Sequence, residues 1–174
     1  MIAERKPILQ AISYRLYNAA VTRAVELPDE AATRGLAAVV AAMAEPGDVI
    51  ALKGELGAGK TTFARAFIHA RGARDEVPSP SFSLVQMYDA GTATIWHFDL
   101  YRLQSPDEAW ELGIEDAFGD GISLIEWPER LGALLPDRRL EIALAFGARP
   151  NTRCAFLAGG IEWQTRLTLI AANV

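Results

Sequence analysis

The stretch Gly54-Glu55-Leu56-Gly57-Ala58-Gly59-Lys60-Thr61 fits the pattern G-x-x-x-x-G-K-[ST] of a phosphate-binding loop. Glycines lack a Cβ atom, so such a loop can curl until successive backbone N–H groups point inward and surround phosphate oxygens. The apolar run 49–52 before it is typical of a strand, and residues 62–70 after it carry apolar side chains at helical spacing. The sequence therefore predicts a nucleoside triphosphate site between a strand and a helix.

The side chains at the end of this loop have separate expected roles. Lys60 reaches the β- and γ-phosphates, and the hydroxyl of Thr61 binds Mg²⁺. The N-terminal end of the following helix adds free N–H donors and a positive partial charge. We expect the nucleotide to contact Glu55, Leu56, Gly57, Ala58, Gly59, Lys60, Thr61 and Thr62.

The composition indicates a compact globular protein. The chain has 174 residues, of which 51% are hydrophobic and 22% charged, enough for one domain with a substantial core. No run approaches the roughly 18 apolar residues that a membrane-spanning helix requires, and the N-terminus lacks the apolar segment of a secretory signal. We therefore expect a cytoplasmic protein that does not contact a membrane.

The charge balance limits the classes of partner. A formal net charge of −5 argues against a broad nucleic-acid-binding face, which requires clustered Lys and Arg. We therefore expect no DNA binding, and contact with RNA only locally or through a partner. Cys154 is the single cysteine, which excludes an intramolecular disulfide, and no Cys/His cluster has the spacing of a zinc site. A buried, reduced thiol is the default interpretation of this residue.

The order of apolar runs and turn residues predicts the fold class. We expect strands at residues 21–27, 49–52, 84–88, 94–99 and 121–125, helices at 28–44, 62–70 and 106–118, and a second antiparallel pair at 140–146 and 154–158. The 106–118 helix is interrupted at Gly113, and residues 163–170 fit either a helix or a strand. This pattern predicts an α/β protein, a three-layer sandwich of the P-loop NTPase type, whose mixed sheet has a parallel centre and antiparallel additions.

We divide the chain into two parts. Residues 1–20 mix apolar, aromatic and charged types without clean periodicity, and we interpret them as an N-terminal extension for which flexibility is one alternative. Residues 21–174 form a single ATPase domain in this interpretation.

Two acidic residues are candidates for the catalytic chemistry. Asp99 and Glu126 each end an apolar strand, and ligands of open α/β sheets bind at the carboxyl ends of strands. Hydrolysis requires acids that hold Mg²⁺ and orient water. The catalytic candidates are therefore Lys60, Asp99 and Glu126, and the metal candidates are Thr61, Asp99 and Glu126. Each acid alone is equally compatible with a strand-end turn or an ion pair.

Other polar residues near these acids have more ordinary interpretations. The hydroxyl-rich loop 79–83 can respond to the γ-phosphate as a switch, but an ordinary turn is slightly favoured. His97 is more typical of a packed or supporting histidine than of a general base, and His69 of a solvated or capping one. No arginine is clearly placed to stabilise the transferring phosphoryl group: Arg65, Arg102 and Arg130 lie near motifs but fit surface ion pairs equally well.

Four motifs in order resemble one bacterial family. They are residues 54–62 (GELGAGKTT), residues 79–85 (SPSFSLV), residues 97–102 (HFDLYR) and residues 126–128 (EWP). This set is similar to the TsaE (formerly YjeE) family, from about residue 21 to the C-terminus. The resemblance implies an ATPase that supports formation of threonylcarbamoyladenosine on tRNA together with the TsaD and TsaB proteins. A separate enzyme makes the threonylcarbamoyl adenylate.

The resemblance also implies roles for individual residues. Thr61 and Glu126 approach Mg²⁺, Asp99 supports the metal or the catalytic water, and Trp127 lies near the ATP. The loop departs modestly from the family, because Ser81 and Ser83 replace common threonines while keeping the hydroxyl. The N-terminal extension is also less usual in the family.

Two other functions remain open at this point. A small-molecule kinase would transfer the γ-phosphoryl to a bound acceptor, but no arginine-rich lid segment follows the core. A nucleotide-sensing binding module would bind ATP and recruit a partner with little catalysis. Our leading interpretation is a Mg²⁺-dependent ATPase whose nucleotide state controls its association with a tRNA-modifying complex.

Overall fold

The structure is a computed structural model of the chain, and it describes residues 21–174. Our interpretation of residues 1–20 therefore lies outside the described residues. The described part contains a single seven-stranded sheet in the order β1-β7-β6-β2-β5-β4-β3. The strands are β1 (Val21–Leu27), β2 (Val49–Lys53), β3 (Val85–Asp89), β4 (Thr94–Asp99), β5 (Ile122–Glu126), β6 (Leu140–Phe146) and β7 (Arg153–Gly159).

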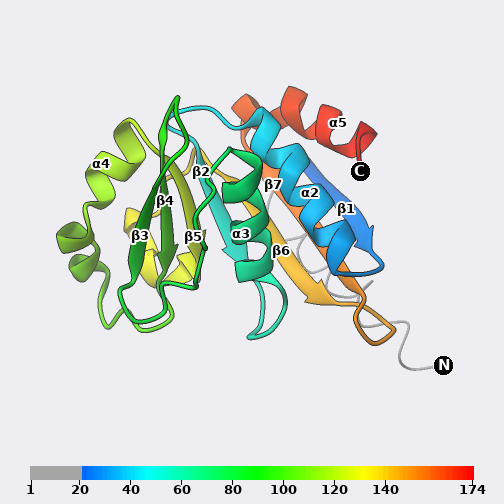
Figure 1. Cartoon of the computed structure of the whole chain (residues 1–174), viewed down its shortest axis with the longest axis horizontal. Coiled ribbons are helices and arrows are strands. Elements are labelled where there is room, and N and C mark those ends of the chain that lie inside the picture. Colours follow the sequence, from blue (N-terminus) through cyan, green and yellow to red (C-terminus); the bar gives the residue numbers. More distant parts are fainter. Residues whose placement is uncertain (1–20) are drawn as a thin grey trace.

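The sheet has a parallel centre and antiparallel edges, which confirms the expected fold class. β2 lies between β5 and β6 and is parallel to both, and β4 is parallel to β5. The pairs β3–β4, β6–β7 and β1–β7 are antiparallel. Parallel neighbours end at the same edge of a sheet, so the carboxyl ends of β2, β4 and β5 meet there. Figure 1 shows the loop after β2 at this edge, at the bottom of the view.

Helices cover both faces of the sheet. The longer helices α2 (Glu30–Met43), α3 (Lys60–Ala70) and α5 (Gln164–Ala172) pack their apolar sides into one core. The short elements η1 (Pro106–Leu112), α4 (Ile114–Gly119) and η2 (Pro128–Leu134) enclose a second core, which includes Val49, Phe98 and Ile125 from the sheet. These layers are the three of the expected sandwich (Figure 1).

Local sequence explains where the helices begin and break. The side chain of Asp29 accepts a hydrogen bond from the backbone N–H of Ala32 at 2.8 Å, which caps α2. The expected interruption at Gly113 is confirmed, because this residue adopts φ +76 between η1 and α4.

The C-terminal segment, for which helix and strand both remained open, is η3 (Ile161–Trp163) followed by α5. Trp163, Leu167 and Ile170 are all buried, as expected for residues spaced by four and three along one side of a helix.

Candidate nucleotide site

The sheet places the phosphate-binding loop next to the strand ends that carry Glu126 and Asp99. Leu52, at the end of β2, pairs with Glu126 of β5, and Glu126 pairs with Asp99 of β4. The phosphate-binding loop therefore begins next to the strand ends that carry both acids. The structure thus brings together candidates separated by up to 72 residues, from Gly54 to Glu126.

The phosphate-binding loop has the shape that its glycines predict. Gly54, Gly57 and Gly59 adopt φ values of +139, +78 and +109, which other residues rarely adopt. At Gly54 a Cβ atom would lie 2.4 Å from the carbonyl oxygen of Leu144 in β6, so the backbones of the loop and of β6 can approach this closely only at a glycine. The backbone conformation of the loop is therefore determined by its packing against β6 as well as by its own glycines.

Arg153, at the start of β7, supports the same loop from outside. Its Nε donates to the carbonyl of Ala58 at 3.1 Å, and one Nη donates to the carbonyl of Gly57 at 3.2 Å. The guanidinium also lies 4.5 Å from the ring centroid of Phe146 on the neighbouring strand. The β6–β7 hairpin therefore anchors the loop backbone.

Lys60 is held inside the loop. Its side chain is buried, and Nζ donates to the carbonyls of Gly54 at 2.7 Å and Glu55 at 2.9 Å. Nζ also lies 3.9 Å from the ring centroid of Trp127. Burial lowers the pKa of Lys60, and the carboxylates of Glu126, Glu129 and Asp99 oppose this change. Lys60 thus holds its amino group between the loop carbonyls and the acids of the cavity.

Glu126 is bonded through both carboxylate oxygens. Its Oε2 accepts the hydroxyl of Thr61 at 2.9 Å, and its Oε1 lies 2.9 Å from Nε2 of His97. The side chains of Glu126 and His97 are 2% and 0% exposed. Thr61 lies in the first turn of α3, so this contact joins the phosphate-binding helix directly to the end of β5.

Asp99 connects the site to the hydroxyl-rich loop. Its Oδ2 accepts hydrogen bonds from Ser79 at 3.0 Å and Ser81 at 2.6 Å, and its Oδ1 accepts one from the backbone N–H of Tyr101 at 3.2 Å. The interpretation of residues 79–83 as an ordinary turn did not include these contacts. The loop is anchored to the acid that stands next to Glu126.

These side chains surround one cavity. It has a volume of about 230 Å³ and is lined by Leu56, Gly57, Gly59, Lys60, Thr61, Thr62, Ser79, Ser81, Asp99, Glu126 and Trp127. Trp127 has backbone angles φ 60 and ψ 49, and its ring packs 5.0 Å from that of Tyr101. All catalytic and metal candidates from the sequence therefore line a single cavity.

The donor set of this cavity suits a hard cation shared with a phosphate. Within residues 21–174 no cluster of three or more His, Cys, Asp and Glu side chains could hold a metal ion by itself. Mg²⁺ commonly takes only one or two carboxylates from a protein and completes its shell with phosphate oxygens and water. The hydroxyl of Thr61 and the carboxylates of Glu126 and Asp99 fit that mode.

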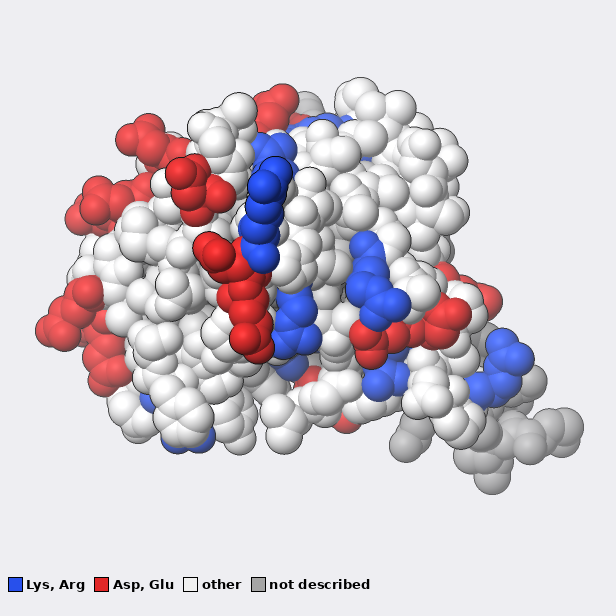
Figure 2. Space-filling model, viewed as in Figure 1, with Lys and Arg blue, Asp and Glu red and all other residues white. Residues whose placement is uncertain are grey.

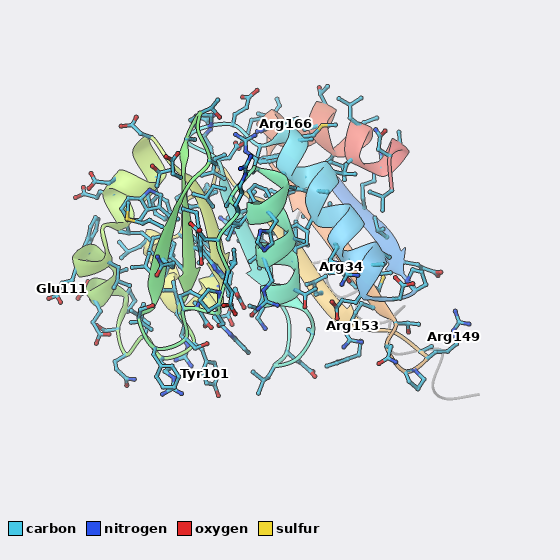
Figure 3. All side chains as sticks on the ribbon, viewed as in Figure 1. Arg34, Tyr101, Glu111, Arg149, Arg153 and Arg166 are labelled. Carbon is cyan, nitrogen blue, oxygen red and sulfur yellow. The ribbon has the colours of Figure 1, made fainter. Side chains whose placement is uncertain are left out.

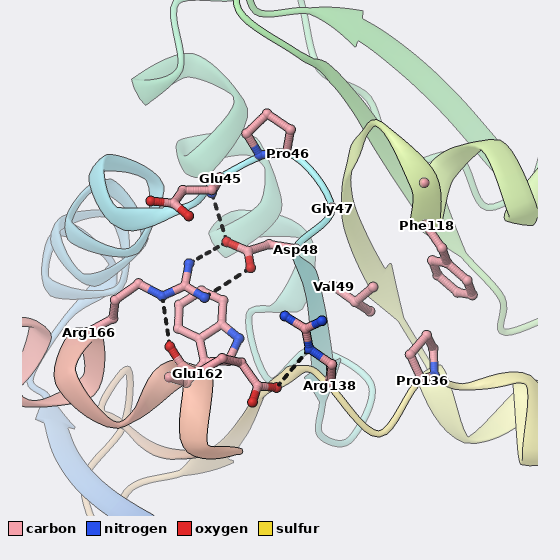
Figure 4. Close-up of a pocket in the computed structure, with 12 residues that line it drawn as sticks. Glu45, Pro46, Gly47, Asp48, Val49, Phe118, Pro136, Arg138, Glu162 and Arg166 are labelled. Atoms are coloured by element: carbon pink, nitrogen blue, oxygen red, sulfur yellow. Dashed lines mark hydrogen bonds and ion pairs between the residues drawn. The ribbon is translucent and has the colours of Figure 1, made fainter.

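A larger cavity elsewhere has different chemistry. It has a volume of about 710 Å³ and is lined by Asp48, Glu162, Arg138 and Arg166 among others. Figure 4 shows that its charged groups bond to each other: Arg166 donates to both oxygens of Asp48, at 2.5 and 3.0 Å, and Arg138 lies 3.8 Å from Glu162. We therefore assign the functional site to the smaller cavity, where loop, lysine and acids converge.

Comparison with known proteins agrees with this geometry. Residues 27–154 match the family model described as "Threonylcarbamoyl adenosine biosynthesis protein TsaE". The chain belongs to the TsaE family. Its relatives include the tRNA threonylcarbamoyladenosine biosynthesis protein TsaE of Rickettsia conorii, 44% identical over 145 residues that cover 83% of each chain. The protein of the same name from Bacillus subtilis is 37% identical over 138 residues, 79% of this chain and 85% of the relative.

A solved structure supports the same family. The crystal structure of Bacillus subtilis YdiB superimposes with a TM-score of 0.73 at 28% sequence identity, and the match covers 89% of this chain and 97% of that one. The TsaE family belongs to tRNA threonylcarbamoyladenosine biosynthesis, and this member has the P-loop-type fold. In the described part of the chain, no helix is both long and apolar enough to cross a membrane.

In this TsaE-family site, the structure adds His97 and Arg153 as supporting residues beside the predicted catalytic and metal candidates. His97 lies two residues before Asp99 on β4 and therefore on the same face of the sheet. The alternation of side chains along a strand could have indicated from the sequence that His97 faces the same side as the acid. Arg153 comes from a strand 93 residues beyond Lys60, so no local motif marks it. Three arginines that lie near motifs do not line the cavity: Arg65, Arg102 and Arg130.

Two of these arginines have other partners. Arg65 donates to the carbonyl of Val77 at 2.9 Å, and Arg102 lies 4.5 Å from the ring centroid of Phe82. Cys154 is only partly buried, yet desolvation raises its pKa and so disfavours the reactive thiolate, in keeping with an inert thiol.

Proposed function

We propose that this TsaE-family protein is a Mg²⁺-dependent ATPase that supports threonylcarbamoyladenosine modification of tRNA. In this proposal its nucleotide state controls assembly with TsaD and TsaB, and hydrolysis resets the complex between cycles. The observation that carries the proposal is the hydrogen bond between Thr61 of the phosphate-binding helix and Glu126 of β5, in the cavity that Lys60 and Asp99 also line. A loop that only bound phosphate would not need two acids at its edge.

A second cavity next to the first gives the nucleotide enough room. It has a volume of about 480 Å³ and is lined by Asp29, Glu30, Thr33, Gly57, Ala58, Gly59, Thr62, Asn151 and Arg153. The two cavities share Gly57, Gly59 and Thr62. Ligand pockets commonly have volumes of about 300–1,000 Å³, so the smaller cavity alone is below that range. We infer that the β- and γ-phosphates occupy the 230 Å³ cavity around Lys60 and that the nucleoside occupies the adjacent 480 Å³ cavity.

The residues of the smaller cavity support hydrolysis by electrostatics. Nζ of Lys60 donates to two loop carbonyls in the structure and would donate to phosphate oxygens instead when ATP binds. There it would neutralise charge on the transferring phosphoryl group. Thr61 and Glu126 would hold Mg²⁺, which supplies further charge neutralisation when bound. Asp99, oriented by Ser79 and Ser81, positions the attacking water.

The charge distribution favours contact with tRNA through partners. Figure 2 shows acidic side chains gathered at the left of the molecule, and Figure 3 places Glu111 of η1 at this side. Residues 103–129 contain no Lys or Arg, and they include Asp107, Glu108, Glu111, Glu115, Asp116 and Asp120. Such a surface repels phosphate backbones rather than neutralising them.

The direct test is phosphate release from ATP by the purified protein, alone and with purified TsaD and TsaB. We expect slow hydrolysis alone and faster hydrolysis with both partners, lost in Lys60→Ala and in Glu126→Gln. Lys53→Ala is the matched control, because Lys53 ends β2 but bonds to Glu141, 2.9 Å away, outside the cavity. Equal rates with and without the partners would contradict control by assembly.

The same assay separates the other functions. A nucleotide-sensing module predicts that Glu126→Gln still binds ATP, recruits the partners and supports modification of tRNA. A small-molecule kinase predicts a phosphorylated metabolite in place of inorganic phosphate. The two acids in one cavity favour hydrolysis over both.

A further inference from the structure

We propose that His97 is a positioning residue that holds the carboxylate of Glu126 in its working orientation. The inference rests on the proposed function, because it concerns how Glu126 meets Thr61 and the metal. His97 does not line the cavity, whereas Glu126 does. We therefore expect His97 to act on nucleotide chemistry through Glu126, its hydrogen-bond partner.

The sheet places the two side chains in register. His97 of β4 pairs with Leu124 of β5, two residues before Glu126. Alternate residues of a strand share a face, so His97, Asp99, Leu124 and Glu126 all face α3. Nε2 of His97 lies 2.9 Å from Oε1 of Glu126, and both side chains are almost completely buried. This contact is buried between two neighbouring strands and is not an accident of surface side chains.

The hydrogen-bonding pattern assigns the proton of the imidazole. Nδ1 of His97 is buried without a hydrogen-bond partner among residues 21–174. A carboxylate only accepts hydrogen bonds, so the N–H at Nε2 donates a hydrogen bond to Oε1 of Glu126. This pattern assigns the Nε2–H tautomer to the ring. Leaving Nδ1 without a partner costs free energy, which is better explained by a task for Nε2 than by filling of the core.

The carboxylate of Glu126 is consequently held from two elements. His97 fixes Oε1 from β4, while Thr61 donates to Oε2 from α3. A flexible glutamate side chain loses its alternative rotamers under these two contacts. Groups that orient a metal-binding carboxylate typically contribute about 10–100-fold to metal affinity. Removing the donor should therefore weaken the response to Mg²⁺ while leaving the phosphate-binding loop intact.

The experiment measures ADP binding by intrinsic tryptophan fluorescence, first in EDTA and then in a titration with MgCl₂. The variants are His97→Gln, His97→Asn and His97→Leu. Glutamine carries its amide nitrogen as many bonds from Cα as Nε2 of histidine, whereas asparagine is one bond shorter and leucine has no donor. The matched control is Tyr88→Phe, which removes a buried hydroxyl without a described partner from the adjacent strand.

We expect all folded variants to bind ADP in EDTA as the wild type does. The Mg²⁺ concentration at half-saturation should rise about tenfold or more in His97→Asn and His97→Leu, and should be largely restored in His97→Gln. Tyr88→Phe should match the wild type. If leucine unfolds the protein, the comparison of glutamine with asparagine carries the same test.

Three results would overturn the inference. The first is an unchanged Mg²⁺ response in the asparagine and leucine variants. The second is a wild type that binds ADP but does not respond to Mg²⁺. The third is loss of folding in every His97 variant while Tyr88→Phe folds, which would make the imidazole a requirement of the core. A wild type that binds no ADP at all would instead contradict the proposed function.

Discussion

At the scale of single residues, two adjacent threonines occupy different positions in the proposed nucleotide site. The hydroxyl of Thr61 lies 2.9 Å from Glu126, whereas Thr62 lines both cavities where they meet. Replacing either threonine by valine keeps the shape and removes the hydroxyl.

We expect Thr61→Val to lower kcat for ATP hydrolysis by roughly 10–100-fold, because a group that acts with the metal is lost. Thr62→Val should mainly raise KM, because it removes a contact with ATP that is equally strong in the ground state and in the transition state. Steady-state kinetics at saturating Mg²⁺ distinguish these effects. The same kcat loss in both variants would contradict the assignment of Thr61 to the metal.

Tyr88 illustrates a polar group that the fold buries at a cost. Its hydroxyl has no hydrogen-bond partner within the described residues, and burial raises its pKa above the ordinary value of 10.0, against the opposing charge of Arg65. Above that ordinary value the unfolded chain releases the proton while the folded chain keeps it. The free energy of unfolding therefore falls as the pH rises through this range.

Tyr88→Phe should remove this alkaline fall in stability. At neutral pH the variant should be as stable as the wild type, or more stable by up to about 1 kcal/mol, since no hydrogen bond is lost. Urea unfolding near neutral pH and again at roughly pH 10–11 makes the comparison. A variant clearly less stable at neutral pH would show that the hydroxyl has a partner after all.

At the scale of elements, the phosphate-binding loop packs so closely against β6 that its first residue must be a glycine. A side chain at Gly54 would meet the carbonyl of Leu144 and would also be strained at φ +139. Gly54→Ala should therefore lower the free energy of unfolding by roughly 3 kcal/mol or more. The control is Gly35→Ala in α2, where no atom lies within 4 Å of the added methyl group.

Gly35→Ala should raise the free energy of unfolding by about 0.5–1 kcal/mol, because alanine favours an exposed helical position. Chemical denaturation of both variants tests the pair. Equal effects of the two substitutions would mean that the loop is not confined by β6.

Arg153 connects the β6–β7 hairpin to the proposed nucleotide site. Arg153→Ala removes the hydrogen bonds to the carbonyls of Gly57 and Ala58 and should weaken ATP binding roughly tenfold, the effect of one hydrogen bond to a charged group. Arg149→Ala, at the tip of the same hairpin, should leave ATP affinity unchanged. Figure 3 shows both side chains at the same end of the molecule. Equal losses in the two variants would point to the net charge of the hairpin instead.

The elements also show what sequence patterns can and cannot predict. β4 and β5 were predictable because each is a short apolar run that ends in an acid. The α5 segment was left open between helix and strand because only three apolar residues marked it, although their spacing of four and three favours a helix. The contacts of Asp99 with Ser79 and Ser81 join residues 18–20 positions apart. They depend on the path of a proline-containing loop, which the periodicity of apolar residues does not predict.

At the scale of the whole molecule, the parallel centre of the sheet creates the site. β2, β4 and β5 end together, so three segments distant in the sequence deliver the loop, Asp99 and Glu126 to one edge. This convergence was predictable from the fold class, which the order of apolar runs around the phosphate-binding motif indicated. His97 and Arg153 did not follow from it, because their roles depend on side-chain contacts between strands.

We propose that this edge of the sheet binds ATP through the phosphate-binding loop. Calorimetric titration of ATP with Mg²⁺ into the purified wild type, Lys60→Ala and Lys53→Ala tests it most directly. We expect one ATP per chain for the wild type and for Lys53→Ala, and binding at least tenfold weaker for Lys60→Ala, because Lys60 alone of the two lines the cavity. Equal ATP affinity of Lys60→Ala and the wild type would mean that the phosphate-binding loop does not hold the nucleotide.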